Sequence, residues 1–223
     1  MQRNMYIIGR DEVGRPRSGR TSPRSYKYII GIDEAGRGPL AGPVVVGGIK
    51  LKARSQKLKI FTGIRDSKKL TPKKREEWFR VLTSHPSIEW AVARITPRTI
   101  DRINIARAAN LGAEKVHQKL CSKLSVGAHR TLLDGGLVLP RDILHETIVK
   151  GDEKIPAIAA ASIIAKVTRD RIMLRLHKKY PQYRFDLHKG YATRLHRQLL
   201  GEFGQCEIHR SSFICKNVGR LVP

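Results

Sequence analysis

The sequence is poor in cysteine, and its cysteines form no recognisable framework. Three are present among 223 residues. An odd number spread widely along the chain argues against a disulfide scaffold and is typical of a reduced, cytoplasmic protein. Cys206, His209 and Cys215 come nearest to a metal-binding set. No second Cys/His pair completes them, so we predict no zinc site there.

The sequence also lacks long apolar runs. No segment approaches the ~18 apolar residues of a membrane-spanning helix. The N-terminus is basic, but it has no continuous apolar core ahead of a small-residue cleavage site, as a secretory signal would. We therefore expect neither a membrane protein nor a secreted one.

Acidic residues are scarce relative to basic ones. The chain has 19 Asp and Glu against 44 Lys and Arg, a formal net charge of +25. Such an excess predicts a polyanionic partner, and nucleic acid is the foremost candidate. The length suits one domain. We expect a monomer with a flexible basic arm (residues 1–25), a core (26–180) and a C-terminal helical segment of the same domain (181–223).

Residues 28–46, YIIGIDEAGRGPLAGPVVV, are the most informative stretch. An apolar run predicts a buried strand that ends on Asp33 and Glu34. A glycine-rich turn follows, and then a second apolar run at 44–46 that predicts a hairpin partner. Anionic metal ligands beside backbone N–H groups and the Arg37 guanidinium would suit a phosphodiester site. The alternative is a capped turn with a solvated acidic pair.

A near-copy of this stretch begins 22 residues earlier, at Tyr6. It carries Asp11 and Glu12, but it has Arg10 where the second copy has Ile32, and a polar, disorder-like segment follows. The second copy therefore has the better strand, and we assign no role to Asp11 and Glu12.

Periodicity and capping residues predict the remaining elements. Thr71 and Pro72 suit the start of a helix. The predicted helices are 73–84, 100–120, 156–179 and 193–203, and the predicted strands are 89–95, 131–134 and 146–149.

Two further aspartates follow strand ends, where ligand sites gather in α/β folds. Asp134 ends one strand, and Asp152 follows the next. Asp170 competes with Asp152, but a continuous helix would separate the two by ~27 Å over their 18 residues. They cannot share one metal site, and Asp170 lies on a basic helix, so we select Asp152.

Aromatic and basic residues alternate beyond residue 180, a pattern that suits stacking on sugar or base beside phosphate contacts. The alternative is a small hydrophobic cluster, which we prefer for Phe185. Lys68, just before a helix start, could be a solvated charge or could reach a phosphate.

Together these motifs resemble bacterial ribonuclease HII. The resemblance runs in order over residues 28–213. Three departures stand out: the N-terminal arm, Gly136 where a polar residue is common, and Ile214-Cys215 in place of Gly-Pro. The matching motifs are DEAGRG (33–38), DSKKL (66–70), LDG (133–135), KGD (150–152), ASIIAKVTRD (161–170), HKGY (188–191) and HRSSF (209–213).

The resemblance implies a ribonuclease H-like α/β fold, a central mixed β-sheet flanked by helices with a small C-terminal helical segment. It implies hydrolysis of RNA in RNA–DNA hybrids and at single ribonucleotides in duplex DNA, leaving 5′-phosphate and 3′-hydroxyl ends. Two Mg²⁺ or Mn²⁺ ions would serve as cofactors, held by the family's four acidic ligands, which match Asp33, Glu34, Asp134 and Asp152.

The resemblance also implies a substrate-reading set. Gly36, Arg37 and Gly38 match the loop that reads the ribose 2′-hydroxyl together with Tyr191. Lys68 and Lys166 are candidate phosphate contacts.

Two other functions stay open. A non-catalytic basic nucleic-acid-binding protein would explain the charge, but not the strand-end carboxylates. Another nuclease or transposase of the same fold would act on DNA, and an all-DNA substrate tests it.

Overall fold

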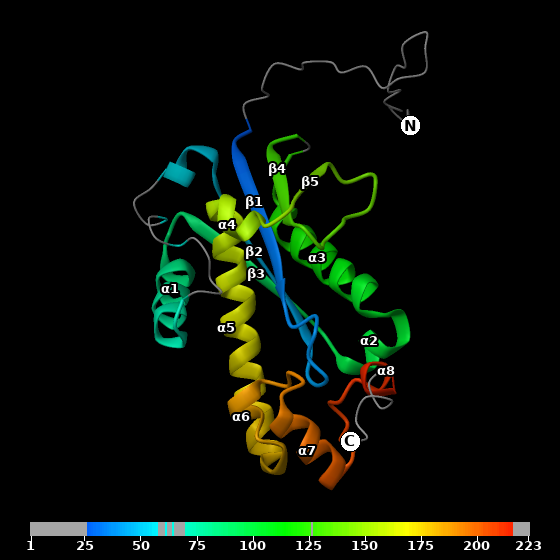
Figure 1. The fold of residues 1–223 in the computed structure, drawn as a ribbon. Coiled ribbons are helices and arrows are strands. Elements are labelled where there is room, and N and C mark those ends of the chain that lie inside the picture. Colours follow the sequence, from blue (N-terminus) through cyan, green and yellow to red (C-terminus); the bar gives the residue numbers. More distant parts are fainter. Residues whose placement is uncertain (1–25, 58–60, 62–63, 65–69, 126, 216–223) are drawn as a thin grey trace.

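The structure is a computed structural model that describes residues 26–57, 61, 64, 70–125 and 127–215 (Figure 1). The predicted arm, with Asp11 and Glu12, lies outside the described residues, as does Lys68.

A mixed five-stranded sheet forms the centre, as predicted. Its strand order is β3-β2-β1-β4-β5. The β1–β2 and β2–β3 pairs are antiparallel, whereas the β1–β4 and β4–β5 pairs are parallel. The second apolar run is thus the hairpin partner of the first. The strands are β1 (Tyr28–Ala35), β2 (Val44–Lys52), β3 (Ile88–Ile95), β4 (His129–Asp134) and β5 (His145–Ile148).

Helices cover both faces of this sheet. The α-helices are α1 (Pro72–Ser84), α2 (Pro97–Ile103), α3 (Ile105–Cys121), α4 (Gly151–Lys154), α5 (Pro156–Lys179), α6 (Phe185–His188), α7 (Arg194–Phe203) and α8 (Ser211–Cys215). Two 3₁₀ helices, η1 (Ala53–Lys57) and η3 (Pro181–Tyr183), complete the described elements.

Alternation along β1 divides the core into two layers. Ile29 packs in a cluster with the apolar side of α5, whereas Ile30 and Ile32 pack in a second cluster with α3. Figure 1 shows these two helices on either side of the sheet. On the α5 side the approach is close, because a Cβ added to Gly31 would lie 2.3 Å from the Ala157 carbonyl carbon. Residues of β1 therefore alternate between the α5 face and the α3 face.

One predicted helix is wrong in its bounds. The segment 100–120 is not one helix, because Asn104 has φ 65° and separates α2 from α3. The Asn104 side chain accepts a hydrogen bond from the Arg107 N–H at 3.0 Å, so it caps α3. The apolar periodicity runs across this break and conceals it. The other predicted helices and strands agree to within a few residues, with α5 at the predicted bounds.

The C-terminal segment packs on the far half of α5. Phe185 is fully buried and forms a cluster with Ala41, Met173, Tyr183 and Ile208, so the preference for a core role is confirmed. Within the described ranges, no helix has the length and apolar character needed to cross a bilayer.

Candidate active site

The parallel pairing of β1 with β4 brings two predicted carboxylates to the same end of the sheet. Ile32 pairs with Leu133, and Asp33 and Asp134 are the next residues of their strands. β1 itself does not end there, contrary to the prediction, because its ladder with β2 continues to Ala35. The carboxylates therefore lie where the β1–β4 ladder stops, not where β1 stops.

Asp33 points to the α5 face of the sheet and is 3% exposed. Burial raises its pKa well above the usual range, and the charges of Glu34 and Asp134 raise it further. Hydrogen bonds from the Ser162 side chain and the Glu34 N–H, the latter 2.7 Å long, act in the opposite direction. Ionised Asp33 is thus surrounded by like charge, and a cation would relieve it.

Glu34, the residue after Asp33, interacts with both Asp134 and Arg37. Burial raises the pKa of Glu34, the Arg37 guanidinium lowers it, and the Asp134 charge raises it. Arg37 Nη1 lies 3.3 Å from Glu34 Oε1 and donates to the Gly136 carbonyl at 2.9 Å. A Cβ on Gly136 would lie 2.9 Å from that Nη1, so this departure from the family pattern makes room for Arg37.

One oxygen of Glu34 remains open to a ligand. Oε2 is buried and accepts no hydrogen bond from any described residue. A buried carboxylate oxygen without a donor is costly unless a cation or water meets it. The local chemistry therefore fits a hard cation.

Asp152 lies in the short helix α4 and is 1% exposed. The preceding residue, Gly151, donates its N–H to Asp134 Oδ1 at 2.8 Å, so α4 is held against the end of β4. Asp170 instead pairs with Lys166 at 2.9 Å, one turn away on α5. The structure thus places the helix that carries Asp152, and not Asp170, against Asp134. We call Asp33, Glu34, Asp134 and Asp152 the carboxylate cluster.

Two buried arginines hold the glycine-rich loop between β1 and β2 (residues 36–43). The sequence did not predict this role for them. Arg210 is fully buried and donates to the carbonyls of Gly36, Arg37 and Gly42 at 2.6, 2.8 and 2.9 Å. Burial lowers its pKa to about 9, which still leaves the guanidinium protonated at neutral pH. Arg169, also fully buried, donates to the Pro43 and Ala41 carbonyls. Five backbone carbonyls of this loop are therefore fixed by side chains.

This anchoring determines where the loop's N–H groups point. A trans peptide directs its N–H away from its C=O. Because the carbonyls of Gly36 and Arg37 face Arg210, the N–H groups of Arg37 and Gly38 face the opposite way. Within the described part of the chain, neither N–H has a hydrogen-bond acceptor. The loop thus offers two oriented donors.

The two outer glycines of this loop are glycine for different reasons. Gly36 has φ +94°, and a Cβ there would lie 2.0 Å from Arg169 Nε. Gly38 has open space, with no described atom within 4 Å of an added Cβ. The fold therefore requires glycine at position 36, whereas a side chain at position 38 would meet no described atom.

Tyr191 lies beside the same loop. The carbonyl of the preceding Gly190 accepts from the Leu40 N–H at 2.9 Å. Lys166 Nζ and the Arg169 guanidinium carbon lie 5.6 and 5.5 Å from the centre of the Tyr191 ring. The tyrosine is 39% exposed, so part of its side chain is open to solvent.

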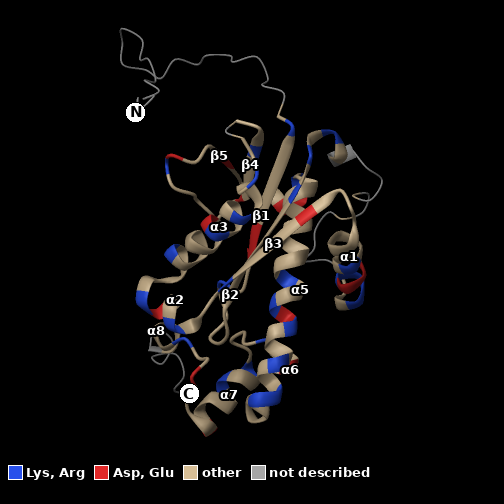
Figure 2. Ribbon diagram, turned by 180° about the vertical axis from the view of Figure 1, so that it is seen from behind, with Lys and Arg blue, Asp and Glu red and all other residues tan. Residues whose placement is uncertain are grey.

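Positive charge surrounds this region. Figure 2 shows Lys and Arg along α5 and on α1, whereas an acidic segment lies within the sheet on β1. Lys166 belongs to this basic surface, although its ammonium is paired with Asp170. Lys68 lies outside the described residues, so its predicted contact stays a prediction.

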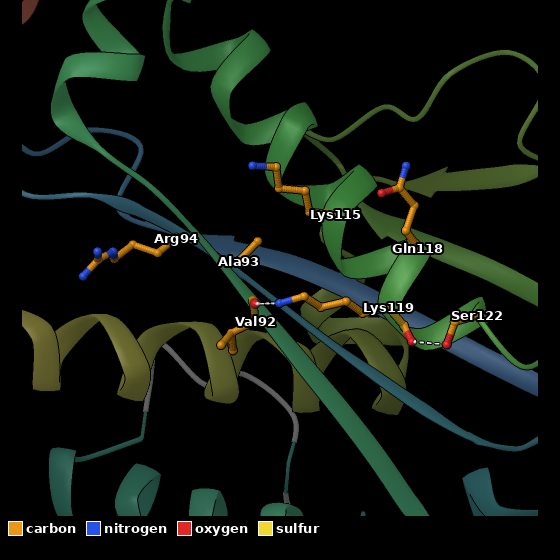
Figure 3. Close-up of a pocket in the computed structure, with 7 residues that line it drawn as sticks. All are labelled: Val92, Ala93, Arg94, Lys115, Gln118, Lys119 and Ser122. Carbon is orange, nitrogen blue, oxygen red and sulfur yellow. Dashed lines mark hydrogen bonds between the residues drawn. The ribbon is translucent and has the colours of Figure 1, made fainter.

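A separate open hollow lies between β3 and α3 (Figure 3). Lys119 Nζ donates to the Val92 carbonyl at 3.3 Å there and so covers the open edge of β3. None of the predicted site residues lines this hollow.

Comparison with known proteins identifies a family for most of the chain. A sequence model of the family described as Ribonuclease HII matches residues 30–216. The Ribonuclease HII of Caldicellulosiruptor bescii is 43% identical over 193 residues, covering 86% of this chain and 89% of that protein. The Ribonuclease HII of Chlamydia trachomatis is 47% identical over 190 residues, covering 85% and 83%.

A solved structure agrees with these sequence matches. The crystal structure of ribonuclease H2 from Pyrococcus horikoshii superposes with a TM-score of 0.67 at 30% identity, covering 87% of this chain and 98% of that one. The predicted ribonuclease H-like fold is thereby confirmed.

Proposed function

We propose, from the premise that this chain belongs to the ribonuclease HII family, that it cleaves RNA in RNA–DNA hybrids and at single ribonucleotides embedded in duplex DNA. Family membership makes it an enzyme, an endonuclease of the ribonuclease H type. The observation that carries the finer proposal is the carboxylate cluster beside a loop that presents unpaired N–H donors.

The carboxylate cluster would hold two divalent ions. Oxygen ligands suit Mg²⁺ or Mn²⁺, and the cluster contains no thiolate or imidazole. Two observations support cation binding. The pKa values of Asp33 and Glu34 are raised, and Glu34 Oε2 accepts no hydrogen bond from the described residues. When bound, the two ions supply the charge that activates water and stabilises the leaving 3′ oxygen, giving 5′-phosphate and 3′-hydroxyl ends.

The chain's own residues set the geometry around that site. Arg37 pairs with Glu34 and contacts the Gly136 carbonyl, so it holds this carboxylate toward the end of β4. The Gly151 N–H fixes one oxygen of Asp134, which leaves the second oxygen for a metal. Ser162 orients Asp33 from α5. These contacts keep three of the four carboxylates in place before any cation arrives.

The loop and Tyr191 would read the junction between ribose and deoxyribose. A 2′-hydroxyl can accept a hydrogen bond from the N–H of Arg37 or Gly38, and only RNA carries one. The open space at Gly38 allows the sugar to approach the backbone closely. Tyr191, next to this loop, offers an exposed ring against which the deoxyribose can stack.

The activity is tested with four duplexes of one sequence: an RNA–DNA hybrid, DNA with one ribonucleotide, all-DNA and all-RNA. We expect metal-dependent cleavage of the first two and none of the others. Cleavage of the all-DNA duplex would instead support a DNA nuclease of the same fold. Binding of all four without cleavage in Mg²⁺ or Mn²⁺ would contradict the proposal.

The reading loop is tested by Gly38→Ala, with Gly201→Ala as its matched control. Both added methyl groups enter open space in the described structure, so neither change should unfold the chain. We expect Gly38→Ala to lower the ratio of cleavage at a single ribonucleotide to cleavage of a hybrid by about tenfold, a cost of ~1.4 kcal/mol. Gly201→Ala should leave the ratio unchanged. An unchanged ratio in Gly38→Ala would exclude close approach at this glycine.

A further inference from the structure

A second group of potential metal ligands lies at the opposite end of the same two strands. His117 and Cys121 stand one turn apart on α3, and His129 begins β4. One ligand atom from each of the three lies within 4.8 Å of the other two. We call these three residues the His–Cys cluster.

Its distance from the carboxylate cluster is substantial. His129 and Asp134 are the first and last residues of β4, which puts ~16 Å between them at ~3.3 Å per residue. His129 pairs with Tyr28 at the start of β1, whereas the carboxylates follow the Ile32–Leu133 pair. The His–Cys cluster is therefore not part of the candidate active site.

The separations match those of a tetrahedral zinc ion. Cys121 Sγ lies 3.2 Å from His117 Nε2 and 3.5 Å from His129 Nε2. Bond lengths of ~2.3 Å for Zn–S and ~2.0–2.1 Å for Zn–N place a sulfur and a nitrogen about 3.5 Å apart at the tetrahedral angle. The three atoms could bind one ion with only small side-chain shifts.

Hydrogen bonds can join the three ligand atoms when no metal is bound. A neutral thiol has one proton to donate, so it can serve as donor to only one of the two imidazoles, and its sulfur accepts from the other. His129 Nδ1, which is not the ring nitrogen beside Cys121, is buried and has no hydrogen-bond partner among the described residues. His145 does not complete the set, because both of its ring nitrogens contact backbone, at Leu139 and Ile143.

The charges around the cluster permit a cation. Burial lowers the pKa of His117 to about 4, so its imidazole is neutral and able to ligate at neutral pH. Lys50 is the nearby positive charge, and it lowers the pKa of the Cys121 thiol against the burial that raises it to about 11. Glu89 pairs with Lys50 at 2.8 Å and offsets its repulsion of an ion. The partial exposure of Cys121 and His129 leaves room for water as a fourth ligand.

We propose that His117, Cys121 and His129 form a binding site for a soft or borderline divalent cation of the Zn²⁺ class, bridging the end of α3 to the start of β4. Binding releases the Cys121 thiol proton to solvent and leaves a thiolate–metal bond, with no redox change. The ion would brace the end of the sheet that is remote from the carboxylate cluster.

Cobalt(II) provides the test, because a cobalt–thiolate bond gives a charge-transfer absorption that carboxylate ligands do not. The reduced, metal-free full chain is titrated with Co²⁺ in excess Mg²⁺, which occupies the carboxylate cluster. We expect the band to reach its maximum at one Co²⁺ per chain and to disappear on addition of one Zn²⁺. Absence of the band in the wild-type chain would overturn the proposal.

Variants locate the band among the three cysteines of the chain. Cys206→Ser/Cys215→Ser leaves Cys121 as the only thiol and should keep the band, whereas Cys121→Ser should lose it. His117→Gln should weaken Co²⁺ binding by about tenfold or more. Each variant should retain Mg²⁺-dependent cleavage of an RNA–DNA hybrid, which reports folding. Loss of the band in the double variant, or its persistence in Cys121→Ser, would overturn the assignment.

Discussion

The two ends of the β1–β4 pair present opposite chemistry on one scaffold. At the carboxyl ends, the carboxylate cluster gathers oxygen ligands, and burial together with neighbouring negative charge raises the pKa of Asp33 and Glu34. At the amino ends, the His–Cys cluster gathers nitrogen and sulfur ligands that are neutral, with the pKa of His117 lowered to about 4. Parallel strands bring like ends together, so each end of the pair collects its own set of side chains.

The two ends therefore differ in how strongly their charge favours binding of a cation. The carboxylate cluster accumulates negative charge that the surrounding protein only partly neutralises, through Arg37. The His–Cys cluster carries no charge until its thiol is deprotonated. A hard ion is therefore expected at one end and a thiophilic ion at the other.

The largest predicted effect is on the rate of cleavage, which should depend on the carboxylate cluster and not on the His–Cys cluster. Asp134→Asn should reduce cleavage about a thousandfold, because it removes one negative charge from the carboxylate cluster while keeping its shape and the Gly151 hydrogen bond. Cys121→Ser, at the other end of the strands, should stay within about twofold of wild type. Single-turnover rates on a hybrid substrate measure both. Comparable losses in the two variants would mean that the ends are not independent.

A smaller effect concerns pH. Since the pKa values of Asp33 and Glu34 are raised, protons compete with metal at these groups as the pH falls. The Mg²⁺ concentration needed for half-maximal cleavage should rise by up to tenfold per pH unit for each proton displaced. Saturating Mg²⁺ should recover the rate. A half-maximal concentration that is independent of pH would argue that the carboxylates are already ionised in the metal-free chain.

The smallest effect is on stability. A raised folded-state pKa means that the stabilisation by Asp33 is present below its unfolded pKa of ~3.9 and is lost as the pH rises through the folded value. In metal-free protein at neutral pH, Asp33→Asn should therefore raise the melting midpoint by a few degrees, at ~2–4 °C per kcal/mol. The gain should vanish at acid pH. Calorimetry with chelator detects it, and a lower midpoint at neutral pH would contradict the like-charge account.

Much of the fold could be predicted from local signals. Thr71 caps α1 by accepting from the Lys74 N–H, and α5 begins at Pro156, as capping residues indicate. The positions of Asp33 and Asp134, each at the end of an apolar run, also follow from the pattern. The break at Asn104 was not predicted, because the hydrophobic repeat continues through it.

The parts of the sites that depend on long-range contacts could not be predicted from the sequence. Arg169 and Arg210 look like two more basic residues in a basic chain, yet they are fully buried and hold the glycine-rich loop. Nothing local marks a buried arginine. The His–Cys cluster left a weak signal, the spacing of four between His117 and Cys121, but its third member comes from β4 through tertiary packing.

The most direct measurement uses a DNA duplex that carries one ribonucleotide and is end-labelled on the cleaved strand. Wild-type chain with Mg²⁺ or Mn²⁺ should give one cut, on the 5′ side of the ribonucleotide, with 5′-phosphate and 3′-hydroxyl ends. Asp134→Asn should make that cut about a thousandfold more slowly. A cut elsewhere, different end groups, or an unchanged cut in the variant would contradict the account of the carboxylate cluster and its reading loop.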